Sequence, residues 1–140
     1  MTTRHGTAIS RAGRGGLILG APGTGKSQLA LQLMALGAGL VADDAVILTE
    51  NSGEIMLSCP KTIGGIIEIR GVGLVSVKAC DPAKLVIVVD LDKTASSRLP
   101  EPASVRVLNI NFPCIHGKGN PNLGAIVWCL LGGGQILPTG

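Results

Sequence analysis

The chain has 140 residues, enough for one compact domain but not for a second core. The net charge is +3, the basic residues are scattered, and there is only one Trp and one Phe, which together exclude the usual features of a nucleic-acid-binding surface. Charged residues make up only 15% of the chain, which favours an oligomer whose subunits cover part of each other's surface.

The four cysteines form no CxxC pair and have no HxxxH motif nearby, so their spacing argues against a zinc site and favours reduced thiols. The N-terminal stretch lacks the apolar segment of a signal peptide. The longest apolar run, Leu123–Leu131, is too short to span a bilayer. We therefore expect a cytoplasmic protein that has no membrane partner.

The first half of the chain predicts strands around one helix. Gly15–Leu19 is typical of a short buried strand that leads into a Gly-rich turn. Ser27–Leu36 has leucines at helical spacing and is followed by glycines that end the helix. Gly39–Ala42 and Ala45–Leu48 predict two further strands, and a turn is expected at 51–53.

The second half predicts more strands and a final helix. The glycines within Ile63–Val77 indicate strands joined by a tight loop, and Leu85–Val89 should be a central strand. Thr94–Pro102 is a polar connection, and the Gly and Pro residues of Pro113–Pro121 predict a loop. Leu123–Leu131 fits a helix or a buried strand, and we favour the helix. Several connections are too short for helical crossovers, so the sheet should be mixed.

One segment carries a complete phosphate-binding motif. The pattern GxxxxGK[ST] is satisfied by Gly20, Ala21, Pro22, Gly23, Thr24, Gly25, Lys26 and Ser27. In such a P-loop, backbone N–H groups surround a phosphate, the lysine reaches the outer phosphates and the hydroxyl ligates magnesium. The predicted strand before it and helix after it are the context that this motif requires, so we expect the loop to bind a nucleotide or phosphate.

Phosphoryl transfer also needs a carboxylate, and two predicted strand ends offer one. Asp90 follows the more apolar strand, which favours it as the Walker B aspartate. Asp43 and Asp44 follow the helix that leaves the loop, and a strand returning beside the first would bring them close to the phosphates. Neighbouring strand residues point to opposite faces, so the pair should divide its tasks between proton transfer and the metal. From the residues alone, an exposed strand end explains the Asp43-Asp44 pair as well as a catalytic role does.

The loop, the helix and the segment GLVADDAVIL are similar to the HPr kinase/phosphorylase family, as is the stretch Ile67–Val75, which resembles that family's EIRGxGII motif. The resemblance covers roughly His5 to Leu131. It implies an α/β, phosphoenolpyruvate carboxykinase-like P-loop domain with a mixed sheet over residues 1–131, and residues 132–140 are expected to form a disordered tail. It also implies a short form, like those of alphaproteobacteria, without the N-terminal domain of longer members.

The resemblance also assigns functional positions. It implies an active-site histidine at His5, the phosphate-binding Lys26, the general base Asp43, a catalytic arginine at Arg98, and magnesium ligands at Ser27 and Glu68. The His116–Asn122 segment is similar to one needed for dephosphorylation. That segment usually reads PVxPGRN, whereas here it reads HGKGNPN, with Lys118 in place of the arginine.

The implied function is an ATP- and magnesium-dependent serine kinase that acts on an HPr-type phosphocarrier protein of the phosphotransferase system, with dephosphorylation as the reverse reaction. The resemblance further implies a hexamer. Two alternatives stay open. A P-loop kinase of a small metabolite would need an arginine-rich lid, which the sequence does not indicate, and a non-catalytic nucleotide sensor would need only the loop.

Overall fold

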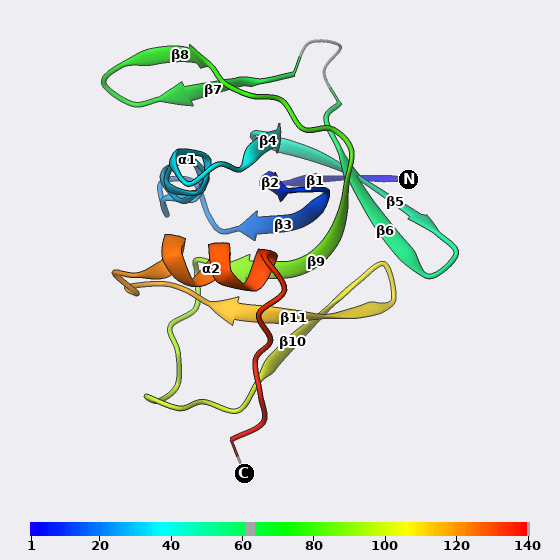
Figure 1. The fold of residues 1–140 in the computed structure, drawn as a ribbon, viewed down its shortest axis with the longest axis vertical. Helices are drawn as coiled ribbons and strands as arrows, with labels where there is room; N and C mark the ends of the chain where they lie inside the picture. Colours follow the sequence, from blue (N-terminus) through cyan, green and yellow to red (C-terminus); the bar gives the residue numbers. More distant parts are fainter. Residues whose placement is uncertain (61–63, 140) are drawn as a thin grey trace.

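The computed structural model describes residues 1–60 and 64–139 and contains eleven strands and two helices (Figure 1). In chain order these elements are β1 (Thr2–His5), β2 (Thr7–Arg11), β3 (Arg14–Leu19), α1 (Lys26–Ala35), β4 (Gly39–Ala42), β5 (Ala45–Asn51), β6 (Glu54–Ser58), β7 (Ile66–Ile69), β8 (Gly73–Ser76), β9 (Ala83–Asp90), β10 (Ala103–Val107), β11 (Ile110–His116) and α2 (Leu123–Leu131).

Nine strands form one mixed sheet in the order β1-β5-β6-β9-β3-β2-β4, with β11 also pairing to β9 and β10 pairing to β11. The pairs β3–β9 and β9–β11 are parallel, and the other pairs are antiparallel. β9 is central, as predicted, because its first residues pair with β6 and its last three pair with β11. This arrangement is the α/β P-loop fold with a mixed sheet that the sequence predicts.

Two apolar cores lie on the two faces of this sheet. Strand alternation sends Leu17 to one core and the next residue, Ile18, to the other. The core around Ile18 includes Leu33 of α1 and Val127 of α2, and both helices cover that face (Figure 1). The opposite core is closed by β5, β6, β10 and β11. Burial of both faces fixes the ends of β3 and β9, where the P-loop begins.

The hairpin β7–β8 forms a separate two-stranded sheet that projects above α1 in the view of Figure 1. Ile67 anchors it, since this side chain is fully buried in the core to which α1 also contributes. Gly71, at φ +84, lies in the tight turn between the strands, where a positive φ favours glycine. The predicted strands and loop are therefore confirmed over residues 64–77, while Ile63 lies outside the described residues.

The structure corrects one predicted loop and extends other predictions. Pro113–Pro121 is not a loop throughout, because β11 continues to His116. Pairing of β11 with β9 begins only at Cys114, so Pro113 lies where one edge of the strand is free and a missing N–H is tolerated. The helix prediction for α2 and the polar connection over Thr94–Pro102 are confirmed. The strands β1 and β2 were not predicted at all.

The last residues form no helix or strand in the part that the structure describes, 132–139, and Thr139 Oγ1 donates a hydrogen bond to Glu101 Oε1 at 2.7 Å. The disordered tail stays a prediction, and its final residue, Gly140, lies outside the described part. Within residues 1–60 and 64–139, no helix has the length and apolar character needed to cross a membrane.

Candidate active site

The P-loop follows β3 and curls back on itself before α1 begins. Gly23 and Gly25 have φ values of +83 and +100, a region that side chains with a Cβ rarely adopt. Thr24 N donates to Ala21 O at 3.2 Å, which closes the turn, and Gly25 forms the N-cap of α1. The unpaired N–H groups of the first helical turn therefore face the loop, and the helix dipole adds a partial positive charge there. This is the geometry of an anion site.

Lys26 lies across this loop. Its side chain is largely buried, and its Nζ donates hydrogen bonds to the carbonyl oxygens of Gly20 at 2.8 Å and Ala21 at 3.1 Å. The ammonium group is thereby held beside the loop amides, where it can exchange these carbonyl partners for phosphate oxygens.

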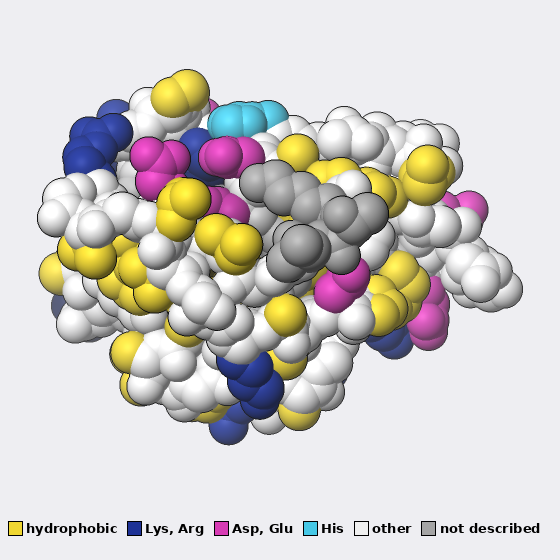
Figure 2. Space-filling model, turned by 90° about the horizontal axis from the view of Figure 1, so that it is seen from above, with side chains coloured by type: hydrophobic (Ala, Val, Ile, Leu, Met, Phe, Trp, Pro, Cys, Tyr) yellow, Lys and Arg dark blue, Asp and Glu magenta, His cyan; other side chains and the backbone are white. Residues whose placement is uncertain are grey.

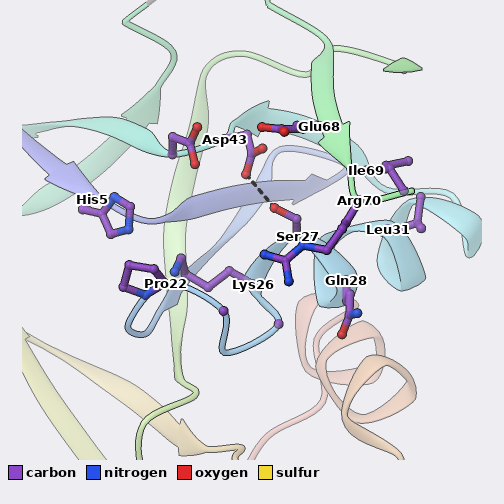
Figure 3. Close-up of a pocket in the computed structure, with 13 residues that line it drawn as sticks. His5, Pro22, Lys26, Ser27, Gln28, Leu31, Asp43, Glu68, Ile69 and Arg70 are labelled. Carbon is purple, nitrogen blue, oxygen red and sulfur yellow. Dashed lines mark hydrogen bonds between the residues drawn. The ribbon is translucent and has the colours of Figure 1, made fainter. Parts of the chain in front are cut away.

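Asp43 faces the loop from β4. Its Oδ1 accepts hydrogen bonds from Ser27 Oγ at 3.1 Å and from the buried Thr7 Oγ1 at 2.9 Å. Figure 3 shows Asp43 and Ser27 pointing toward one another. Two donors on one oxygen fix the orientation of the carboxylate, and they leave its other oxygen available to a ligand.

The route by which Asp43 reaches the loop differs from the prediction. β4 does not lie beside β3, because β2 is inserted between them. The idea that Asp43 and Asp44 point to opposite faces is also wrong. Asp44 has φ +68 and the pair forms a bend after β4, so strand alternation ends before it. Both aspartates line the same cavity.

That cavity has a volume of about 360 Å³, within the range of roughly 300–1,000 Å³ typical of ligand sites. It is bounded by the P-loop and α1 on one side and by β7 on the other. Its charged and titratable lining consists of the carboxylates of Asp43, Asp44 and Glu68 and the basic groups of His5, Lys26 and Arg70. Acidic side chains gather beside a histidine on the face seen in Figure 2, and Figure 3 shows Glu68 on the β7 side and Arg70 extending from the end of β7 toward Ser27.

These residues fit a magnesium ion that arrives with phosphate. Among the residues that the structure describes, no group of three or more His, Cys, Asp or Glu side chains could hold a metal ion by itself. Mg²⁺, however, is usually bound by one or two carboxylates together with water and substrate phosphates. The hydroxyl of Ser27 and the carboxylates of Asp43 and Glu68 supply suitable oxygen donors around the cavity.

The matched family agrees with this geometry. The model of the HPr Serine kinase C-terminal domain matches residues 1–97 of the chain. The chain belongs to this HPr serine kinase family.

Relatives and a solved structure extend the match. The HPr kinase/phosphorylase of Bordetella pertussis is 46% identical over 78 residues, which cover 55% of this chain and 25% of that protein. That of Nitrosomonas europaea is 34% identical over 117 residues, which cover 78% of this chain and 36% of that protein. The HPr(Ser) kinase/phosphatase from Coxiella burnetii matches with a TM-score of 0.78 and 26% identity, over 94% of this chain and 88% of that chain. The chain thus spans a quarter to about a third of the curated relatives.

Most of the positions expected from the HPr serine kinase family come together in the structure. His5, Lys26, Ser27, Asp43 and Glu68 all line the first cavity, although they come from three separate elements, β1, α1 and β7, and from the bend after β4. Their individual roles stay predictions.

Arg98, by contrast, is exposed on the connection between β9 and β10 and is not among the residues that line the cavity. Its catalytic role also stays a prediction.

Sequence reasoning missed two contacts that shape this family member's site. One is the hydrogen bond from Thr7 to Asp43, and no local pattern indicated it. The other is at Asp92, whose Oδ1 accepts from Ala21 N at 3.0 Å and so ties the P-loop to the end of β9. Parallel pairing places Leu19 beside Asp90, which brings the segments after β3 and β9 together. The available signal was the pair of acidic residues at and just after the end of β9, Asp90 and Asp92, at the sheet edge where β3 leads into the P-loop.

Asp90, the candidate favoured by hydropathy, has a side chain that hydrogen-bonds to the backbone two residues further along the chain. Its Oδ1 accepts from Asp92 N at 2.9 Å, and the residue is not among those that line the cavity. Burial, and then the nearby Asp90 carboxylate, raise the pKa of the Cys114 thiol. Cys114 therefore stays protonated and packs as a small apolar side chain.

Proposed function

We propose that this chain transfers the γ-phosphoryl group of ATP, with magnesium, to a serine hydroxyl of an HPr-type phosphocarrier protein of the phosphotransferase system. One observation carries the proposal: the Asp43 carboxylate is oriented by two hydrogen bonds at the edge of a complete P-loop. A phosphate cage alone binds nucleotides. A fixed carboxylate beside the cage supplies the base that an attacking hydroxyl needs.

The P-loop side holds the phosphates. The loop amides and the α1 dipole neutralise negative charge, and Lys26 turns from its two carbonyl partners to the outer phosphates. Ser27 and Glu68 hold magnesium, which withdraws charge from the phosphate oxygens when bound. These contacts are preorganised where charge develops during transfer, so they lower the barrier to the chemical step.

Asp43 moves the proton. Its carboxylate accepts the proton of the serine hydroxyl as the oxygen attacks the γ-phosphorus and the bond to the leaving oxygen of ADP breaks. In the dephosphorylation reaction an oxygen of inorganic phosphate attacks the phosphorus of phosphoserine, so that pyrophosphate forms and the bond to the serine oxygen breaks. The Asp43 carboxylate takes the proton of the attacking phosphate and passes it to the departing serine oxygen. His5 lines the same cavity from β1, and Figure 3 shows its side chain on the side of Pro22 and Lys26.

We extend the proposal to the setting of the enzyme, a cytoplasmic homo-oligomer that is a hexamer by family resemblance. Large apolar side chains are exposed, among them Val72 at 74%, Leu74 at 77% and Leu99 at 69%. Apolar groups of this size, on a chain with few charges, are the surface that sister subunits would cover.

Transfer of label from ATP tests this function. The chain is incubated with γ-labelled ATP, magnesium and purified HPr-type proteins, and labelled serine is identified in the product. Asp43→Asn should keep ATP binding and lower transfer by roughly 10²- to 10⁴-fold, because the base is lost. Glu50→Gln is the matched control, since it removes one negative charge from an exposed position outside the cavity.

Three results would argue for another function. Label on a small metabolite instead of protein would favour a metabolite kinase. A nucleotide sensor would bind ATP without transferring label, and its Asp43→Asn variant would keep both binding and signalling. Equal activity in Asp43→Asn and Glu50→Gln would show that Asp43 is not the general base.

A further inference from the structure

A second cavity lies on the other side of α1 from the carboxylates. It is formed by the P-loop at Gly25, by α1 at Gln28 and Gln32, and by the loop after β11 at Lys118 and Asn120. Figure 1 shows α2, which also borders it, and the β7–β8 hairpin on opposite sides of α1. Both cavities share Gly25 and Gln28. A ligand that lies over the P-loop amides can therefore extend into both.

The walls of this second cavity are fixed by contacts within the chain. Gly117 N donates to Asp90 O and Lys118 N donates to Lys93 O, both at 3.0 Å, so the loop is tied to the end of β9. A Cβ at Gly117 would lie only 2.6 Å from Leu123 Cδ2, and the absence of a side chain lets this leucine close the cavity floor. The segment that ties the P-loop through Asp92 thus also holds the opposite wall.

Gln32 is placed in a similar way. A Cβ at Gly124 on α2 would lie 2.8 Å from Gln32 Oε1, so the missing side chain makes room for this carboxamide between the two helices. Asn120 Oδ1 accepts from Asn122 N at 3.0 Å, which orients its amide and leaves its NH₂ group as a donor. The oriented amide of Asn120 and the carboxamide of Gln32 therefore border the same space.

The P-loop sets the direction in which a nucleotide must run. Lys26 and Ser27 serve the outer phosphates, and the acceptor hydroxyl needs Asp43, so the γ-phosphate end points to the first cavity. The inner phosphates lie over the amides of the loop and the first turn of α1. The nucleoside part of the nucleotide must then extend past Gln28, which borders the second cavity.

The size and chemistry of the cavity match that nucleoside part. Its volume of about 170 Å³ is below the range typical of a whole ligand, so it suits one part of a larger molecule. Leu29, Leu91 and Leu123 line it, and since each is only 4–7% exposed, a small part of each side chain is available to contact a ring. The carboxamide of Gln32 presents a donor and an acceptor side by side, the pattern that pairs with the edge of adenine, and Asn120 adds its NH₂ group as a donor.

We propose that this second cavity binds the adenosine end of the nucleotide, with Gln32 and Asn120 hydrogen-bonding the base and Lys118 facing the inner phosphate. The proposal rests on the proposed function for the identity of the nucleotide. It assigns the loop after β11 to nucleotide binding, in addition to the dephosphorylation role that family resemblance implies for the 116–122 segment.

Calorimetric titration with magnesium·ADP and with magnesium·pyrophosphate tests this assignment, because pyrophosphate occupies the P-loop but lacks the nucleoside. Gln32→Ala and Asn120→Ala, each made singly in the full chain, should weaken ADP binding by about tenfold. Pyrophosphate affinity should stay within about twofold of wild type, which also shows that each variant is folded. Gln135→Ala, an exposed glutamine outside both cavities, is the matched control.

Unchanged ADP affinity in both variants, or a wild-type chain that binds pyrophosphate as tightly as ADP, would overturn the assignment. The outcome is separate from that of the kinase proposal. Selective loss of ADP binding in a chain that labels no HPr-type protein would retain the adenosine site and refute the kinase.

Discussion

The two walls of the first cavity are built in different ways. The P-loop wall is carried by β3 and α1, whose side chains Ile18 and Leu33 are fully buried in the core between sheet and helices. The hairpin wall is carried by β7 and β8, and within residues 66–76 the side chain of Ile67 alone is fully buried. Apolar burial provides most of the free energy that holds an element in place. The phosphate-binding wall is therefore firmly positioned, whereas Glu68 and Arg70 depend on one fully buried side chain, with Ile69 and Val75 only partly buried against the same core.

This contrast teaches that phosphate binding and completion of the catalytic cavity are separable. Damage to the hairpin should leave the P-loop able to bind nucleotide while removing groups that act on the transferring phosphoryl. Local stability often varies in this manner within one domain, and elements with few buried contacts open first.

The largest effect is expected at the P-loop wall. Lys26→Ala removes the cation that compensates charge on the outer phosphates, so transfer should fall by roughly 10²- to 10³-fold, as it does when one preorganised donor is lost. Initial rates of labelled phosphate transfer measure this. Lys84→Ala is the control, since Lys84 is about half exposed and its Nζ pairs with Glu54 at 3.2 Å, outside the cavity. Comparable losses in both variants would show that the effect is general and not local to the loop.

The next largest effect is expected at the hairpin wall, when its buried side chain is truncated. Ile67→Ala removes the buried anchor and should cost about 2 kcal/mol of local stability, the low end for such a truncation because the hairpin is free to shift. Hydrogen exchange should accelerate over 66–76 and transfer should fall, while nucleotide affinity stays near wild type. Ile66→Ala is the matched control, because that neighbour is 45% exposed. If exchange accelerated equally across α1, the two walls would not be independent.

The smallest effect is expected at the hydrogen bond from Thr7 that orients Asp43 beside the P-loop wall. Thr7→Val keeps the side-chain shape but deletes the hydrogen bond to Asp43, so we expect transfer to fall by about tenfold. Because the role of Thr7 is to position the carboxylate, kcat should fall more than KM rises, and Thr7→Ser should restore the rate. A variant with normal kcat and reduced thermal stability would assign Thr7 a purely structural role.

Local patterns predicted much of this molecule. The P-loop, α1, the central β9 and the final helix were recognised because each is encoded by adjacent residues with a clear period or motif. The structure also brought together five of the expected site residues. The errors fell where the chain pairs over long distances, as at β11, where Pro113 suggested a loop but partners on β9 and β10 maintain the strand.

The sequence by itself determined that an anion-binding loop joins a strand to a helix, since glycine conformations, a lysine and a hydroxyl at fixed spacing are local properties. The tertiary structure alone decided what stands around that loop. Strand β2 separates β3 from β4, Thr7 contacts Asp43 across 36 positions, and Asp92 holds Ala21 across 71. Such contacts follow from which strands pair and how the core packs, and these are set by the whole chain, not by any one segment of it.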